Sequence, residues 1–261
     1  MVRKIIENGT PRIDRTGVGT LALFGEQLRF NLVEGSLPLI TTKYLPWKII
    51  YKELLWFISG STNSNILEDE GVNIWKGYGF QWRHSGAFYR GFDVDYTNQG
   101  IDQLSNVIDG LKTDPYSRRH VVNSWNPTDL PKMTLPPCHY SFQFFVHDDD
   151  KGRKMLSCLV SMRSSDVGLG LPFNIASYAM LTHMIAHVLG YYPYELVMSL
   201  GDTHVYQNHV AGLNTLCSRV PSRQPTFNIS GNVSVITDFT IDDVDVTGYH
   251  PQGKIKMRMA V

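Results

Sequence analysis

The chain of 261 residues has few cysteines and lacks any pattern by which they would be paired. Cys138, Cys158 and Cys217 are odd in number and have neither the spacing of a disulfide framework nor that of metal ligands. This usage is typical of a reducing compartment. We therefore expect a cytoplasmic protein that holds no metal.

The sequence also lacks an excess of charge and any long apolar run. Lysine plus arginine and aspartate plus glutamate both number 24, so no electrostatic footprint for nucleic acid or an anionic membrane is present. No apolar run is long enough to span a bilayer, and residues 1–9 do not read as a secretory signal. No glycine-rich phosphate loop points to a nicotinamide or flavin cofactor. A small anionic ligand would need a local cluster of basic residues.

No repeat, low-complexity tract or long linker divides the chain, so we expect one domain over residues 1–261. Apolar and polar residues alternate at 27–32, which predicts a strand. Two further runs rich in strand-forming residues, 140–146 and 155–160, flank the turn residues 148–153 and predict a hairpin.

Apolar residues at helical spacing predict two helices. One covers 47–59 and is closed by Gly60, and the other covers 175–189 and is closed by Gly190. Strands and helices mixed without regular alternation predict an α+β domain.

Two runs carry candidate chemistry: LPPCH at 135–139 and RSSDVGLGLPFN at 163–174. A cysteine in an apolar chain is commonly an inert buried residue, so Cys138 alone would be a weak candidate. Its histidine neighbour, the arginine-serine run and the late run GDTHVYQNH at 201–209 supply groups that lower a thiol pKa and move protons. The pattern predicts a cysteine nucleophile beside an anion site.

These runs resemble the thymidylate synthase family, and the resemblance covers practically the whole chain. Further matching motifs are DRTG at 14–17, TTK at 41–43, ELLWF at 53–57, YGFQWRH at 78–84 and KMRMAV at 256–261. So many motifs in the family's order are specific. The resemblance implies a single domain around a large twisted mixed sheet flanked by helices, with two subunits packing sheet against sheet. It implies reductive methylation of dUMP to dTMP with 5,10-methylenetetrahydrofolate.

The resemblance also assigns roles to individual residues. Cys138 is the implied nucleophile, which adds to C6 of the pyrimidine, and Arg163 contacts both the nucleophile and the phosphate. The implied catalytic residues are Glu53, Tyr78, Cys138, His139, Arg163 and Asn174. The implied substrate-binding residues are Arg15, Arg118, Arg119, Ser164, Asp166, Asn174, His204 and Tyr206. The implied folate-binding residues are Trp75, Asp166, Leu169, Gly170, Phe173 and Ala260.

Local alternatives stand beside several of these roles. Arg118 and Arg119 match arginines that the family donates to the phosphate site of the other subunit, yet adjacent arginines before a strand are also typical of a solvated turn. Asn174 can donate to and accept from the edge of uracil, and relatives acting on dCMP commonly carry aspartate there. An asparagine before an apolar helix is equally typical of an N-cap.

Glu53 falls on the apolar stripe of the helix at 47–59, which predicts a raised pKa suited to a general acid or base. A pair with Lys48 or Lys52 is the alternative. His204 and Tyr206, which match ligands of the deoxyribose hydroxyl, would otherwise read as polar core residues.

Three departures from the family pattern bear on the product. The link between Trp75 and Tyr78 is short, Met162 stands where glutamine is usual, and Tyr44 replaces a basic residue. A short link beside the folate could admit water, which makes a dUMP or dCMP 5-hydroxymethylase the alternative. Asn174, Trp75 and the tail at 256–261, which resembles the family segment that closes over folate, favour methylation.

A binding protein or an inactive relative is the other class to weigh. The chain keeps Cys138 and the phosphate arginines, which favours an enzyme, and it has no basic-aromatic stripe for RNA.

Overall fold

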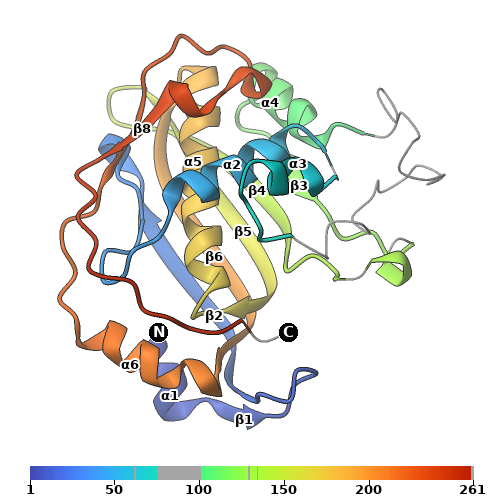
Figure 1. The fold of residues 1–261 in the computed structure, drawn as a ribbon. Coiled ribbons are helices and arrows are strands. Elements are labelled where there is room, and N and C mark those ends of the chain that lie inside the picture. The colour runs from blue at the N-terminus through green and yellow to red at the C-terminus, as the bar shows by residue number, and fades with distance from the viewer. Residues whose placement is uncertain (62, 76–100, 129, 134, 260–261) are drawn as a thin grey trace.

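The computed structural model describes residues 1–261 apart from 62, 76–100, 129, 134 and 260–261 (Figure 1). Its helices are α1 (Val2–Asn8), α2 (Trp47–Ile58), α3 (Asn65–Asp69), α4 (Gln103–Thr113), α5 (Gly170–Leu189) and α6 (Val210–Ser218). Its strands are β1 (Thr10–Arg12), β2 (Thr20–Asn31), β3 (Val121–Asn123), β4 (His139–Asp148), β5 (Lys154–Asp166), β6 (Tyr192–Tyr206), β7 (Thr226–Ile229) and β8 (Val244–Thr247). Short 3-10 helices cover Val33–Gly35, Leu130–Lys132, Gln207–His209, Ile236–Asp238 and Ile241–Asp243.

Within the described residues, six strands form one sheet in the order β1-β2-β6-β5-β4-β3. β5 and β6 run parallel, and the other neighbouring strands run antiparallel. A parallel pair needs a crossover connection, and α5 supplies it between β5 and β6. The prediction of an α+β fold around a large mixed sheet is confirmed.

The predicted hairpin is also confirmed, because β4 and β5 pair down to Asp148 and Lys154. Its turn closes where the Asp149 N–H donates to Arg153 O at 3.0 Å, and Gly152 takes the left-handed φ of 71° that this turn requires.

The centre of the fold is α5, which lies in front of the large sheet and is crossed by α2 (Figure 1). Its side chains are apolar almost all round, which is typical of a core helix rather than a surface one. It ends as predicted at Gly190, where φ is 68° and the next residue, Tyr191, donates its N–H to Ala186 O at 2.8 Å.

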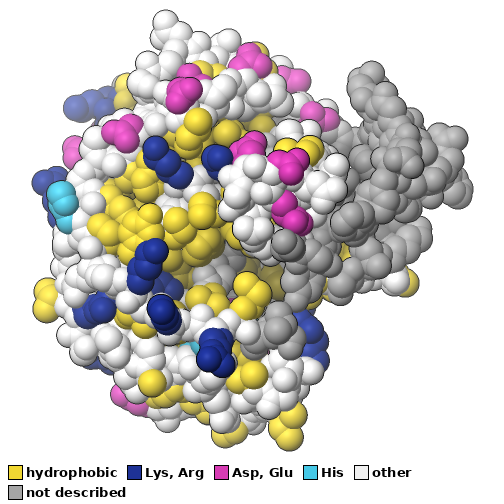
Figure 2. All heavy atoms as spheres, in the orientation of Figure 1, with side chains coloured by type: hydrophobic (Ala, Val, Ile, Leu, Met, Phe, Trp, Pro, Cys, Tyr) yellow, Lys and Arg dark blue, Asp and Glu magenta, His cyan; other side chains and the backbone are white. Residues whose placement is uncertain are grey.

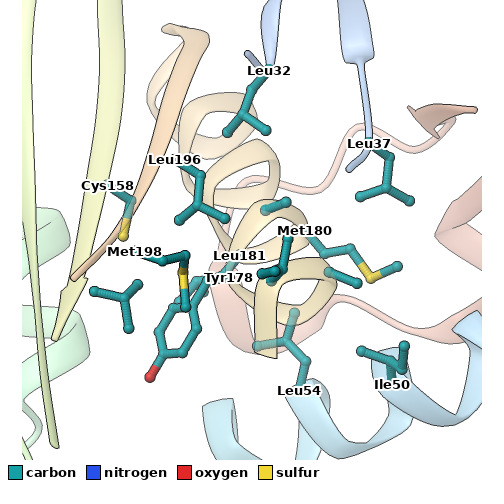
Figure 3. Packing of buried hydrophobic residues seen from close by; sticks show 14 of the residues in the cluster. Leu32, Leu37, Ile50, Leu54, Cys158, Tyr178, Met180, Leu181, Leu196 and Met198 are labelled. Carbon is teal, nitrogen blue, oxygen red and sulfur yellow. The ribbon is translucent and has the colours of Figure 1, made fainter. Parts of the chain in front are cut away.

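The core fills the space between α5, the sheet and α2. Leu196 and Met198 of β6 and Cys158 of β5 face Tyr178 and Leu181 of α5, as Figure 3 shows. Ile50 and Leu54 of α2 lie on the other side of α5 in the same view. Truncation of one such side chain to alanine costs about 2–5 kcal/mol, so this packing holds the site's elements in place.

The helical side of the molecule carries apolar side chains near its centre, with lysine and arginine side chains nearby (Figure 2). No helix in the described part of the chain combines the length and hydropathy needed to cross a bilayer.

Candidate active site

Cys138 is held at the entrance to β4 by the side chain of Arg163 from the neighbouring strand β5. Arg163 Nε donates to Pro137 O at 2.9 Å, and its Nη2 donates to Pro136 O at 2.7 Å. The same Nη2 lies 3.9 Å from Cys138 Sγ. Because one guanidinium fixes both proline carbonyls and faces the sulfur, the thiol has a rigid mount beside a positive charge.

The Cys138 thiol nevertheless has a pKa above its ordinary value in this single chain. Burial raises the pKa, and the charges of Arg163 and Arg15 lower it by less. The two arginines act in the direction that the sequence predicted, but desolvation of the thiol outweighs them.

Arg15 lies exposed in the loop between β1 and β2. Asp14 closes this loop by accepting hydrogen bonds from Thr16 Oγ1 at 2.6 Å and from the Gly19 N–H at 2.9 Å. The bond from Thr16 is the largest cause that lowers the pKa of Asp14, so the carboxylate stays charged and the loop stays closed.

Glu53 lies on the buried face of α2 and is 6% exposed. Trp75 Nε1 donates to Glu53 Oε1 at 2.7 Å. Burial raises the pKa of Glu53 to about 7, although the bond from Trp75 lowers it. Lys52 pairs with Glu70 instead, at 3.2 Å, and Glu53 makes no ion pair with a described residue. The alternative of a pair with Lys48 or Lys52 is therefore wrong, and the predicted raised pKa is present.

Glu53, His139 and Asn174 line one cavity of about 220 Å³ between α2, α5 and β4. The apolar walls of this cavity include Leu54, Phe57, Ile58, Leu104, Val122, Phe142 and Leu181. A few polar groups among apolar walls are typical of a site for a small molecule.

His139 is neutral in this cavity. Its Nδ1 lies 2.8 Å from the hydroxyl of Tyr178, and burial lowers the pKa of His139 to about 4. A neutral imidazole can donate from one nitrogen and accept at the other, as a water network requires.

Asn174 lies inside α5, which begins at Gly170 with Leu169 as its N-cap. The alternative that Asn174 caps this helix is therefore wrong. Its amide makes no hydrogen bond with a described residue, so it is available to a ligand. Gly170 lies near both Asn174 and Asp166, since a Cβ there would lie 4.0 Å from Asn174 Oδ1 and 3.9 Å from Asp166 Cβ.

The parallel pairing of β5 and β6 sets polar residues side by side at the ends of the two strands. Ser164 pairs with Asp202, and Asp166 pairs with His204. His204 is buried, and its Nδ1 lies 2.9 Å from Asp202 Oδ1. Tyr206 follows on β6 with its ring centroid 5.2 Å from that of His204. Four of the predicted substrate residues thus lie on two adjacent strands.

Arg118 and Arg119 lie in the exposed turn between α4 and β3, and neither makes an ion pair with a described residue. The turn is held by His120, whose Nε2 lies 2.9 Å from Asp114 O, and by Gln143, whose Nε2 donates to Arg118 O at 3.4 Å. In this single chain both arginines lie in an exposed turn before a strand, as the alternative predicts. Their binding of phosphate therefore stays a prediction.

The expected folate residues fall into two groups. Trp75 packs against Trp56 and Phe57, with ring centroids 6.1 Å and 5.9 Å apart, next to Glu53. The second group lies at the start of α5, beside Asp166, and consists of Leu169, Gly170 and Phe173. Tyr78 and Ala260 lie outside the described residues.

Two residues of the site were missed from the sequence. Trp125 places its ring 5.7 Å from Arg163 Cζ, and no spacing in the sequence indicates this contact. His209 belongs to the run at 201–209, but nothing in that run indicates that it contacts Asp166, which it does at 3.8 Å. Among the described residues, no group of three or more His, Cys, Asp or Glu side chains could hold a metal ion.

Comparison with known proteins agrees with this geometry. The family model described as thymidylate synthase matches residues 1–261. A thymidylate synthase of Saccharomyces cerevisiae is 45% identical over 289 aligned residues, which cover 100% of this chain and 95% of the yeast protein. The human thymidylate synthase is 45% identical, with 100% and 88% covered.

A third relative is longer than this chain. A probable thymidylate synthase of Schizosaccharomyces pombe is 46% identical over 100% of this chain, which spans 46% of that protein. Full-length agreement with the family model and with two relatives of similar size leaves no segment of the chain unmatched. This chain belongs to the thymidylate synthase family.

Proposed function

We propose that this chain methylates dUMP to dTMP, with 5,10-methylenetetrahydrofolate supplying both the carbon and the hydride. The observation that carries the proposal is the Cys138 thiol facing Arg163 at 3.9 Å in a chain that matches the family over its whole length.

The chemistry explains why a thiol is needed. C5 of uracil is too weak a nucleophile to attack unaided. A bond from Cys138 Sγ to C6 pushes the C5–C6 electron pair towards O4, so that C5 becomes nucleophilic and attacks the one-carbon unit. Loss of the C5 proton and of tetrahydrofolate leaves an exocyclic methylene. Hydride transfer from tetrahydrofolate, which is oxidised to dihydrofolate, gives the methyl group and expels the thiolate.

The cavity residues supply the proton transfers and the recognition of the base. Glu53, with a pKa of about 7, exchanges protons through water at O4, and neutral His139 orders that water. Asn174 donates to O4 and accepts from the N3–H of uracil.

The phosphate and sugar of the nucleotide take the remaining polar groups. Arg15, Arg163 and Ser164 bind the phosphate from the same chain, and His204 and Tyr206 bind the deoxyribose hydroxyl. Folate lies against the residues around Trp75 and the start of α5, with Asp166 as its polar contact. Ala260, which lies outside the described residues, is a further proposed folate contact.

Arg118 and Arg119 of a partner subunit complete the phosphate site in a homodimer. One row across the large sheet, in register order, is Arg29, Val197, Leu159, Gln143 and Val121. Leu159 and Val121 of this row are 37% and 42% exposed, and a second subunit packing sheet against sheet would cover them.

A hollow of about 630 Å³ lined by Arg163 and Trp125 gives a partner's arginines room. Their charge would offset the burial that raises the pKa of Cys138.

Mass spectrometry of the nucleotide product tests the reaction, with dUMP and dCMP supplied in parallel beside methylenetetrahydrofolate. Methylated dUMP is expected. A hydroxymethylated nucleotide would instead identify a hydroxymethylase, and the first residues to exchange would then be Met162 and the link after Trp75.

Subunit mixing tests the homodimer. Neither C138S nor the double variant R118A/R119A should be active alone. Mixed dimers should regain about a quarter of the normal activity, because half of the dimers then hold one complete site. No recovery on mixing, with both variants folded, would contradict a shared phosphate site.

The free thiols of Cys138, Cys158 and Cys217 suit a reducing compartment such as the cytoplasm.

A further inference from the structure

His209 contacts two parts of the proposed site that are far apart in the sequence. Its side chain is 0% exposed and lies just after β6. Nε2 lies 2.7 Å from Arg258 O in the C-terminal segment, and Nδ1 lies 3.8 Å from Asp166 Oδ1 at the end of β5. One imidazole therefore stands between a carboxylate of the site and the backbone of the closing segment.

Both neighbours of the ring are hydrogen-bond acceptors. A carbonyl oxygen can only accept, so Nε2 must carry a hydrogen and donate to Arg258 O. An ionised Asp166 also only accepts hydrogen bonds. A neutral ring that donates to Arg258 O would therefore turn the lone pair of Nδ1 towards Asp166. A doubly protonated ring can donate to both acceptors. Nδ1 is buried and has no hydrogen-bond partner within the described residues, so a small shift of the ring would complete the contact with Asp166.

The charges around the ring favour this cationic form. Burial and the charge of Lys43 oppose protonation, but the nearby Asp166 carboxylate and the hydrogen bond to Arg258 O raise the pKa of His209 above its ordinary value. Burial likewise opposes ionisation of Asp166, yet the interaction with His209 helps to hold the pKa of Asp166 below its ordinary value. Tyr206 faces the ring at 5.5 Å between centroids and adds no charge while its hydroxyl is protonated.

We propose that His209 is a positioning residue that couples the Asp166 carboxylate to the C-terminal segment. A ligand bound at Asp166 and closure of the segment at Arg258 then stabilise each other, because coupling between two sites is reciprocal. This inference rests on the proposed function in taking Asp166 as a folate contact. The anchoring of Arg258 by His209 does not depend on it.

The direct test is H209Q, which can serve one of the two neighbours but not both. Tetrahydrofolate is titrated into the complex of the protein with dUMP, and dUMP is titrated alone. We expect the Kd for tetrahydrofolate to rise about tenfold, in the range set by loss of a charge-assisted hydrogen bond. The Kd for dUMP should change by less than about twofold, because His209 is not among the residues proposed to bind dUMP. Trypsin cleavage after Arg258, followed by mass spectrometry, should be several-fold faster.

A second variant moves the ring without deleting it. A Cβ at Gly168 would lie 2.6 Å from His209 Nδ1 and 3.3 Å from Asp166 Oδ1. G168A should therefore push the imidazole from the carboxylate and weaken tetrahydrofolate binding as H209Q does. H250Q is the matched control, because His250 is exposed and makes no contact with Asp166.

Four results would overturn the proposal or its basis. Unchanged tetrahydrofolate affinity in H209Q and G168A overturns the coupling, and so does an equal loss of dUMP and tetrahydrofolate binding. If the unmodified chain binds no tetrahydrofolate, the proposed function fails instead. Trypsin cleavage after Arg258 that is as slow in H209Q as in the unmodified chain overturns the anchoring of Arg258 by His209.

Discussion

Trp75 donates its indole N–H to the buried carboxylate of Glu53 at 2.7 Å. Burial raises the pKa of Glu53 to about 7, while this hydrogen bond favours the charged form. A carboxyl group that titrates near neutrality is populated in both forms there, as a group that passes protons must be.

Replacing Glu53 with glutamine should make stability less dependent on pH. Folding raises the pKa of this acid from 4.5 to about 7, so the folded state holds the proton more tightly. Below the unfolded pKa, Glu53 contributes its full stabilisation of the folded state. This stabilisation, about 3 kcal/mol, is lost as the pH rises from 4.5 to about 7. E53Q should therefore be more stable than the unmodified chain at pH 8 and similar to it at pH 4.5. Urea unfolding at both pH values measures the difference.

E70Q is the control, because Glu70 is an exposed partner of Lys52 and has no such burial. An E53Q stability difference that is the same at both pH values would contradict the raised pKa. In turnover, E53Q should lose at least about a hundredfold in kcat.

Trp75→Phe should shift the pH profile of the enzyme. Without the indole donor, burial of Glu53 is no longer opposed, so the pKa of Glu53 should rise further above 7. The limb of the kcat profile governed by this group should move to higher pH. W56F is the control, because Trp56 donates its indole N–H to Asn63 O instead. An equal shift in both variants would show that lost aromatic packing, rather than the hydrogen bond, is the cause.

The sequence predicted the central elements better than their limits. The alternating run at 27–32 is the second half of β2, which spans Thr20–Asn31. The predicted helix at 175–189 starts five residues earlier, at Gly170. Gly170 and Pro172 look like helix breakers in a sequence, but a proline in the first turn costs no intrahelical hydrogen bond.

The resemblance named the site residues, but the sequence could not give their electrostatics. Glu53 on an apolar stripe was expected to have a raised pKa, and it does. For Cys138 the sequence indicated neighbours that lower the pKa, and Arg163 and Arg15 do so, but the net shift is upward because burial of the sulfur outweighs them. Such a balance is set by three-dimensional packing, which a spacing of residues does not encode.

Alkylation by iodoacetamide tests the state of Cys138. Since its pKa lies above the ordinary value, the rate in the nucleotide-free protein should still be rising with pH beyond 9. R163A removes the nearest cation, which lowers the pKa of Cys138, and should therefore slow the reaction at pH 8 by about tenfold. C138S identifies labelling of the other cysteines, of which Cys158 is 0% exposed. A rate independent of pH between 7 and 9 would mean that the thiolate already predominates.

Asn174→Asp should reverse the preference between uracil and cytosine. An ionised aspartate can only accept hydrogen bonds, so it opposes O4 of uracil and suits the amino group of cytosine. Because the Asn174 amide lies in α5 without a hydrogen bond to a described residue, the exchange should leave the helix intact. N174D should weaken dUMP binding by about a hundredfold and strengthen dCMP binding, within the range for an unpaired buried polar group. Calorimetric titration of both nucleotides measures this, with N174A as the control that removes the amide and adds no acceptor. If N174D loses dUMP and gains no dCMP relative to N174A, Asn174 does not read the base.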